Sequence, residues 1–208
     1  GSKTITGISM NTGDLRAGDL FVAMPGKKTH GAEFAQKAFD SGAVAVVTDA
    51  EGFELLRKTS IPDAIPVLLL ESPRSHLGEL AAFVYSNRDG RQPTIYGTTG
   101  TNGKTTTTTL VQQILSLSGH PCGLIGTVQN ITGGVSMESI RTTPESTDLF
   151  SGIKQSFESG DRYVSVEVSS IGLEMSRVEG AQFAVGAFTN LTHDHLDFHG
   201  DMETYFSS

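Results

Sequence analysis

Short apolar runs alternate with helix-period patterns along the first part of the chain. Three of these runs predict strands, at residues 19–24, 43–49 and 65–72. The last two are continuously apolar, as strands buried on both faces are. Two helices are predicted, over residues 32–42 and from Pro73 onward, because their apolar residues share one face: Phe34, Ala38 and Phe39 in the first, and Leu77, Leu80, Ala81 and Val84 in the second.

A second series of strands and helices follows the polar stretch Asn87–Pro93, which we interpret as a linker. A helix is predicted from Lys104 to Ser118, with Gly119 ending it and an inward face made by Leu110, Ile114 and Leu117. The Gly-Gly pair within residues 129–139 is typical of a β-hairpin. The predicted strands are residues 94–96, 122–128, 163–168 and 183–190, the last two buried on both faces.

This alternation of strands and helices predicts an α/β fold in two domains. We expect a small N-terminal α/β domain at residues 3–88 and a second α/β domain at residues 93–208. Ligands of open α/β sheets bind at the carboxyl ends of the strands. Three polar features occupy such ends here: a glycine-rich loop after residue 96, Glu167 and His195.

Composition narrows the classes of function. The net charge of −8 over 208 residues argues against a general binder of nucleic acid or of membrane surfaces, which would show a basic face. No apolar run approaches the roughly 18 residues of a membrane span. The single cysteine, Cys122, allows no intrachain disulfide and fits a reducing compartment.

The glycine-rich loop reads GTTGTNGKTTTTTL, from Gly97 to Leu110. The common phosphate-loop pattern G-x-x-x-x-G-K-[ST] would need a glycine where Thr98 stands. The physical requirements nevertheless remain: a strand, a tight glycine turn, and a helix N-terminus whose N–H groups and dipole face an anion. Lys104 would reach the terminal phosphates and the Thr105 hydroxyl would bind Mg²⁺. A glycine-rich turn with a solvated lysine is the alternative, which this combination disfavours.

Five further segments, taken with this loop, resemble the Mur ligase superfamily, and within it the MurE-type ligases. The form T-G-T-N-G-K-T is that family's ATP loop, without the outer glycine. The other segments are GDLFVAMPGKKTHG, LIGTV, RTTPE, EVSSIGLEMSRVEG and FTNLTHDHLDFHGDMETY, which occur in the family's order and extend the resemblance over nearly the whole chain. The resemblance implies an N-terminal nucleotide-sugar domain followed by a P-loop central domain.

The implied activity is ATP-dependent ligation of a diamino acid to a UDP-N-acetylmuramoyl dipeptide in peptidoglycan synthesis, with ADP and phosphate released. The resemblance implies that Lys104, Glu167 and His195 are catalytic, and that Thr105, Glu167 and His195 bind Mg²⁺. His199 is interpreted as structural. The ATP-binding residues implied are Gly100, Thr101, Asn102, Gly103, Lys104, Thr105 and Thr106. Without the resemblance, a capping or salt-bridged role for Glu167 and a hydrogen-bonded structural role for His195 stay open.

Substrate contacts are implied at Thr142, Thr143, Ser169 and Arg177, the last as a two-pronged grip on a carboxylate or phosphate. In the first domain, the resemblance implies that the uridine diphosphate part of the substrate is bound by Thr12, Lys27, Lys28 and Thr29. Two positions depart from the family pattern: Ile171 replaces its histidine after E-V-S-S, and ISMNTGDLRAGD replaces its D-S-R triplet.

The resemblance also predicts a cytoplasmic monomer and a chain that stops before the central domain is complete. The C-terminal domain would be absent, and so would a carbamylated lysine expected just past Ser208, so we expect this piece alone to be inactive. Other hypotheses are a different ligase of the superfamily, such as a folylpolyglutamate synthase, a phosphate-loop kinase or GTPase, and a nucleotide-binding module without activity. No guanine-reading or acceptor-lid motif is found for a GTPase or kinase.

Overall fold

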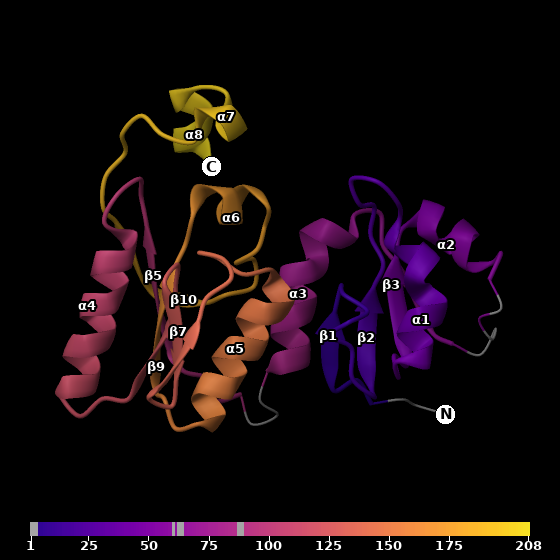
Figure 1. Ribbon diagram of the computed structural model, residues 1–208, viewed down its shortest axis with the longest axis horizontal. Helices are drawn as coiled ribbons and strands as arrows, with labels where there is room; N and C mark the ends of the chain where they lie inside the picture. Colours follow the sequence, from indigo (N-terminus) through magenta and orange to yellow (C-terminus); the bar gives the residue numbers. More distant parts are fainter. Residues whose placement is uncertain (1–3, 60, 62–64, 87–89) are drawn as a thin grey trace. The chain divides into compact units, whose positions relative to one another are not determined.

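A computed structural model describes residues 4–59, 61, 65–86 and 90–208, and the chain divides into two compact units, 1–85 and 86–208 (Figure 1). Each unit contains a sheet with helices packed on it. Residues 87–89 of the predicted linker lie outside the described part. Within the described ranges, no helix combines the length and apolar character needed to cross a membrane.

The first unit is built on a parallel sheet of four strands in the order β1-β2-β3-β4. Its elements are β1 (Gly7–Ser9), β2 (Asp19–Val22), the 3₁₀ helix η1 (Gly31–Phe34), α1 (Ala35–Asp40), β3 (Ala45–Thr48), α2 (Ala50–Leu56), β4 (Val67–Leu69) and α3 (Pro73–Tyr85). Leu77 and Ala81 are buried, as the spacing in α3 predicts. The Tyr85 hydroxyl accepts a hydrogen bond from the Ile8 N–H at 3.3 Å, which fixes the end of α3 to β1.

Two predictions for this unit are wrong. The run at 65–72 forms β4, which pairs only with β3 at one edge of the sheet, and its three residues are exposed rather than buried on both faces. Phe34 is also exposed. It lies in the 3₁₀ turn η1, and a 3₁₀ turn repeats every three residues, so the face that enters the core at α1 is made by Ala35 and Ala38 instead.

The second unit contains a mixed sheet in the order β10-β5-β9-β6-β7-β8, in which the first four strands are parallel and β7-β8 is an antiparallel hairpin. Its strands are β5 (Thr94–Thr99), β6 (Cys122–Ile125), β7 (Gln129–Thr132), β8 (Val135–Glu138), β9 (Tyr163–Glu167) and β10 (Phe183–Phe188). Its helices are α4 (Lys104–Leu117), α5 (Ser146–Glu158), α6 (Ser170–Glu174), α7 (Leu196–His199) and α8 (Met202–Ser207).

The sequence patterns place most of this unit correctly. Val164 and Val166 of β9 are fully buried, as a two-sided strand requires. The predicted hairpin turn is confirmed: Gly133 and Gly134 both adopt positive φ, which a two-residue turn of type I′ needs. Strand β10, predicted to be buried on both faces, is instead an edge strand with most of its residues exposed.

The predicted inward face of α4 is also wrong. Leu110, Ile114 and Leu117 are 51%, 62% and 89% exposed, and the face on the sheet carries Thr108 and Gln112. Gln112 donates to the Cys122 carbonyl at 3.1 Å, so a polar side chain anchors the helix to β6. Thr105, in the first turn of α4, donates to the Glu167 carboxylate of β9 at 3.2 Å, and Thr108 and Gln112 follow on the same helix face at i+3 and i+7.

The buried state of Cys122 generates a test of this packing. Burial raises the pKa of the Cys122 thiol from 9.0 to about 11. At pH 8 the folded chain should therefore hold roughly a hundredfold less thiolate than the unfolded chain. We expect a thiol reagent to modify the native protein very slowly and to modify one thiol per chain at once in denaturant. Fast, stoichiometric labelling of the native protein would contradict the burial of β6.

Candidate nucleotide and metal site

The glycine-rich loop joins the end of β5 to the start of α4, and its shape depends on two glycines. Gly100 and Gly103 have φ of 123° and 86°, a region that other residues rarely adopt. A Cβ on Gly100 would lie 2.2 Å from the Thr189 hydroxyl oxygen. Thr98 is still in β5, paired with Glu167, so no glycine is needed there. The loop can therefore form without a glycine at position 98, and the backbone N–H groups at the N-terminus of α4 lie at its end.

A second loop, which follows β10, fixes the glycine-rich loop from the side. The Thr101 N–H donates to the Asn190 carbonyl at 2.8 Å, and the Asn102 N–H donates to the Asn190 side-chain oxygen at 3.1 Å. The Thr189 hydroxyl and the Asn190 amide both donate to the Asn102 carbonyl, at 2.7 and 3.0 Å. Asn102 is therefore an organiser of the loop in this structure.

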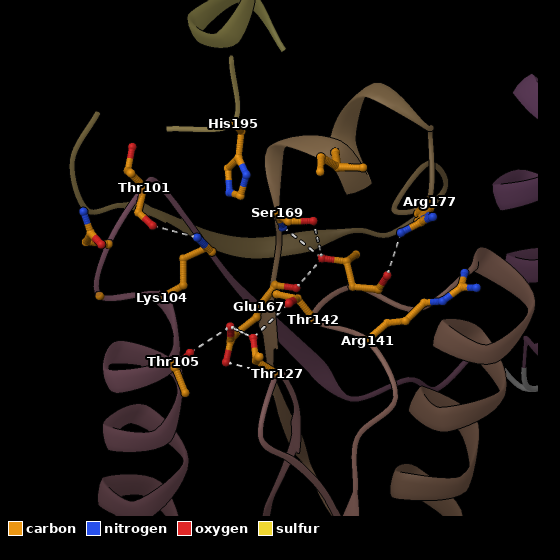
Figure 2. A pocket seen from close by; sticks show the side chains of 14 residues that line it. Thr101, Lys104, Thr105, Thr127, Arg141, Thr142, Glu167, Ser169, Arg177 and His195 are labelled. Carbon is orange, nitrogen blue, oxygen red and sulfur yellow. Dashed lines mark hydrogen bonds between the residues drawn. The ribbon is translucent and has the colours of Figure 1, made fainter. Parts of the chain in front are cut away.

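Lys104 is the cation of the loop. Its ammonium donates to the carbonyls of Gly100 at 2.7 Å and Thr101 at 3.0 Å, which folds the side chain back over the loop (Figure 2). Partial burial lowers the pKa of Lys104, and the charges of Glu167 and Asp194 oppose that shift. An anion in the loop would offer the ammonium stronger acceptors than these two carbonyls.

Glu167, the last residue of β9, lies next to the start of α4 and is 1% exposed. One carboxylate oxygen accepts from the Thr127 N–H at 3.2 Å, and the other accepts from the hydroxyls of Thr127 at 2.8 Å and Thr105 at 3.2 Å. Gly126 leaves room for it, because a Cβ there would lie 2.7 Å from the carboxylate. The alternative for Glu167 is a structural role as a helix cap or in a salt bridge. Among the described residues, Glu167 makes neither contact.

The donor set around Glu167 suits Mg²⁺, which prefers carboxylate, hydroxyl and water oxygens and is usually held by one or two carboxylates together with substrate phosphates. The Thr105 hydroxyl already lies against the carboxylate. Across the described ranges, no group of three or more His, Cys, Asp or Glu side chains could hold a metal by itself. The residues therefore fit a cation completed by a bound phosphate, rather than one enclosed by protein alone.

His195 lines the same pocket as Lys104 and Glu167 and points toward it from the segment before α7 (Figure 2). It has a positive φ of 53°. Its backbone N–H donates to the Asp194 carboxylate at 2.8 Å, and its ring Nε2 lies 3.8 Å from that carboxylate. His193, by contrast, is exposed. Thr106 follows Thr105 in the first turn of α4 and is exposed.

The other end of the pocket is formed by the residues around Thr142 and Ser169. The buried Thr143 hydroxyl donates to the Glu167 carbonyl at 3.0 Å and accepts from the Ser169 N–H at 2.9 Å. The hydroxyls of Thr142 and Thr127 lie 2.9 Å apart. These contacts tie the 142–143 segment directly to the end of β9, and Ile171 completes the wall where the family has histidine.

The guanidinium of Arg177, predicted to bind a substrate carboxylate or phosphate through two hydrogen bonds, already contacts two groups of its own chain. Its guanidinium lies 2.9 Å from the Glu145 carboxylate and donates to the Thr143 carbonyl at 3.1 Å, and its buried Nε has no hydrogen-bond partner among the described residues. Arg141 shares Glu145 at 3.1 Å but is 55% exposed and lines the pocket. Both arginines line the pocket: Arg177 supports the 142–145 segment, and Arg141 has the more exposed side chain.

Sequence reasoning missed Thr127, Arg141 and Glu145. Thr127 lies two residues after the end of β6, so the rule that ligands meet the carboxyl ends of strands could have identified it. Arg141 immediately precedes the Thr142-Thr143 pair in a segment already selected. Glu145 gives no local signal, because its role depends on where Arg177 lies in space.

The predicted residues of the first unit lie together on that unit. Thr12 follows β1, and Lys27, Lys28 and Thr29 follow β2, its parallel neighbour, so both groups lie beyond the same end of the sheet. The lysines are exposed. The 27–29 loop is closed by the Gly26 N–H, which donates to the Thr29 carbonyl at 3.1 Å.

Two family models match the chain: "Mur ligase family, catalytic domain" at residues 4–85 and "Mur ligase middle domain" at residues 98–208. The resemblance inferred from the motifs is therefore confirmed. Enzymes named UDP-N-acetylmuramoyl-L-alanyl-D-glutamate–2,6-diaminopimelate ligase are 42% identical over 208 residues in Streptomyces coelicolor and 40% identical over 204 residues in Geobacter metallireducens. The matches cover 100% and 98% of this chain but 40% and 38% of those proteins, so the chain spans about two fifths of their length.

Solved structures agree with this assignment of the fold. A 2,6-diaminopimelate ligase of the same name superposes with a TM-score of 0.76 at 27% identity, over 98% of this chain and 39% of that one. The MurF ligase of Thermotoga maritima in complex with ADP superposes with a TM-score of 0.65 at 22% identity, over 97% of this chain and 41% of that one, and shows the shared fold.

The geometry of Glu167 generates a test. Glu167→Gln keeps the shape of the side chain but removes its charge, so we expect ATP affinity in the presence of Mg²⁺ to fall by about tenfold or more, and ATP affinity in EDTA to change little. Titration calorimetry measures both. Asp161→Asn is the matched control, since Asp161 is a buried, hydrogen-bonded carboxylate held by Ser156 and the Gly133 N–H. Equal loss of affinity with and without Mg²⁺ would remove Glu167 from the metal site.

Proposed function

Because the chain belongs to the Mur ligase family, we propose that the protein is an ATP-dependent ligase that joins a diamino acid to UDP-N-acetylmuramoyl-L-alanyl-D-glutamate. The observation that carries this proposal is the Lys104–Thr105–Glu167 cluster, which opens into one pocket with Thr142, Ser169 and Arg141. A phosphate site and a polar acceptor site are thereby neighbours. The names of the relatives favour 2,6-diaminopimelate as the diamino acid.

The proposed reaction has two steps. The acceptor carboxylate attacks the γ-phosphorus of ATP, the bond to the β,γ-bridging oxygen breaks, and an acyl phosphate and ADP form. The amine of the diamino acid then attacks the acyl carbon, loses a proton and displaces phosphate, leaving an amide. Both steps place negative charge on phosphoryl oxygens, so positioning and electrostatic stabilisation provide most of the catalysis.

Different residues of this chain would bind the phosphates, the transferred group and Mg²⁺. The backbone N–H groups of residues 103–105, at the start of α4, would hold the phosphates, since those of Thr101 and Asn102 donate to Asn190. Lys104 would leave the Gly100 and Thr101 carbonyls to bind the transferred group. Thr105 and Glu167 would hold Mg²⁺, with His195 on the far side, and the ion would neutralise charge on the phosphates. The residues Gly100, Thr101, Asn102, Gly103 and Thr106 complete the ATP site.

The acceptor would lie against Arg141, Thr142 and Ser169, with Thr143 and Arg177 shaping that wall from behind. In the first unit, Thr12, Lys27, Lys28 and Thr29 would bind the uridine diphosphate. We propose the cytoplasm, where ATP and nucleotide-linked precursors are available, and a monomer as the working form.

The test is ATP-dependent phosphate release by the protein at the full length of its relatives. The acceptor and the diamino acid are supplied singly and together, and the product is identified by mass. We expect release only with both, and a mass increase equal to the diamino acid less water. Phosphate release with ATP alone, at the same rate as with both substrates, would contradict a ligase.

Arg141 generates a sharper prediction within this reaction. Arg141→Gln removes the one pocket-lining guanidinium that is half exposed among the described residues, so we expect KM for the UDP-muramoyl dipeptide to rise by about tenfold and KM for ATP to stay within about twofold. Arg162→Gln is the control, because Arg162 is an exposed arginine of the same unit that lies over the Phe157 ring. A change in KM for ATP alone would place Arg141 on the nucleotide instead.

A further inference from the structure

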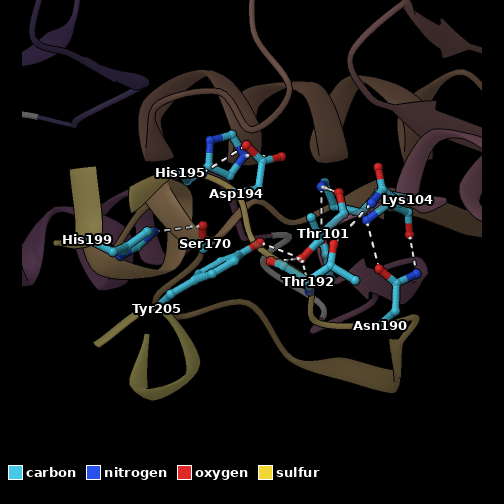
Figure 3. A network of polar contacts seen from close by, with 11 residues as sticks. Thr101, Lys104, Ser170, Asn190, Thr192, Asp194, His195, His199 and Tyr205 are labelled. Atoms are coloured by element: carbon cyan, nitrogen blue, oxygen red, sulfur yellow. Dashed lines mark hydrogen bonds and ion pairs between the residues drawn. The ribbon is translucent and has the colours of Figure 1, made fainter. Parts of the chain in front are cut away.

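Tyr205 of α8 contacts the middle of the glycine-rich loop although it is far from it in sequence. Its hydroxyl lies 3.0 Å from the Thr101 hydroxyl, and both residues are buried (Figure 3). The Thr101 hydroxyl also accepts from the Thr192 N–H at 2.9 Å and lies 3.3 Å from the Thr192 carbonyl. One hydroxyl can donate once and accept twice, so all contacts are satisfied when Tyr205 donates to Thr101.

The Tyr205 ring is held in turn by His199. The two rings stack with centroids 4.9 Å apart and planes 19° from parallel. His199 is buried, and its Nε2 lies 2.9 Å from the Ser170 hydroxyl at the start of α6. Ser170 follows Ser169, which binds Thr143 beside the end of β9. The pair thus connects the phosphate loop on one side with the segment that follows Glu167 on the other.

His195 lies close to both of these contacts, the one between Tyr205 and Thr101 and the one between His199 and Ser170. It precedes α7, whose last residue is His199, and its ring contacts the Tyr205 ring edge-on at 6.1 Å. Its left-handed backbone is an unfavourable conformation for a residue with a side chain, and such conformations persist where the surroundings over-determine them. Here the surroundings are α7 and α8, which are fixed to Thr101 and Ser170.

We propose that Tyr205, supported by His199, is a positioning residue that sets the place of His195 relative to the phosphate loop and Glu167. This inference rests on the proposed function, because it assumes that ATP and Mg²⁺ occupy the pocket. Three segments that are separate in sequence, 100–105, 167–170 and 195–205, must keep one spacing for a metal-bound phosphate to meet Thr105, Glu167 and His195 together. The hydroxyl pair and the stacked rings join all three segments.

The test is the affinity of the 208-residue chain for ATP, measured by titration calorimetry in Mg²⁺ and in EDTA. Tyr205→Phe removes one hydroxyl and keeps the stacked ring. We expect the Kd for ATP in Mg²⁺ to rise about fivefold, with a smaller rise in EDTA, as for the loss of one buried hydrogen bond. Tyr163→Phe is the matched control, because Tyr163 begins β9 at the opposite end of the strand from Glu167. Its Kd should equal that of the unsubstituted chain.

A double-mutant cycle with Thr101→Val identifies the contact responsible. If the effect of Tyr205→Phe travels through the Thr101 hydroxyl, it should largely disappear in the Thr101→Val background. Full additivity, or an unchanged Kd in Tyr205→Phe, would overturn the inference. So would equal losses in Mg²⁺ and EDTA, since a merely structural role would not depend on the metal. Failure of the unsubstituted chain to bind ATP in Mg²⁺ would overturn the proposed function, and this inference with it.

Discussion

The buried carboxylate of Glu167 is the constraint on which the second unit depends. Removing a carboxylate from water costs several kcal/mol unless its oxygens are hydrogen-bonded or paired. The chain supplies two hydroxyls, one N–H group and the nearby Lys104 charge. These groups come from two places, Thr127 after β6 and Lys104 and Thr105 at the start of α4, so the carboxylate is satisfied only when β5, β6 and β9 are in register. The fold and the candidate site are specified by the same contacts.

This arrangement makes the site a product of strand register. In the parallel part of the sheet, Thr98 of β5 pairs with Glu167 of β9, and Ile125 of β6 pairs with Val166. The glycine-rich loop, Glu167 and Thr127 therefore leave the sheet at one level. The loop after β10 adds Asn190, and the segment beyond it adds His195. A shift of one residue in β9 would turn Glu167 to the other face of the sheet.

Much of this could be predicted from sequence, because the signals are local. Continuous apolar runs indicated β3 and β9, the glycine-lysine-threonine spacing indicated the loop before α4, and the order of the motifs indicated the family. The failures concern position within a sheet. Nothing in the runs that form β4 and β10 distinguishes an edge strand from a central one, since that depends on which strands pair.

The predicted inward face of α4 is wrong for a related reason. Thr105 in its first turn donates to Glu167, and the face that contains Thr105, Thr108 and Gln112 therefore lies on the sheet in place of Leu110, Ile114 and Leu117. Arg177 shows the same limit at the site. An arginine at a ligand-binding position of the motif can serve a carboxylate of its own chain, here Glu145. Spacing predicted that Arg177 would be near the pocket. Its pairing with Glu145, and the more exposed Arg141 that shares this carboxylate, follow only from the folded arrangement.

The central claim is that Glu167 and Thr105 bind a divalent cation together with a nucleotide phosphate. Mn²⁺, which accepts the same oxygen ligands as Mg²⁺, reports on this directly. The most direct measurement is an anomalous difference map from crystals of the chain grown with ADP and Mn²⁺. The account predicts one strong peak within coordination distance of a Glu167 carboxylate oxygen, the Thr105 hydroxyl and a phosphate oxygen. Nucleotide bound in the loop, with Mn²⁺ held away from Glu167, would contradict it.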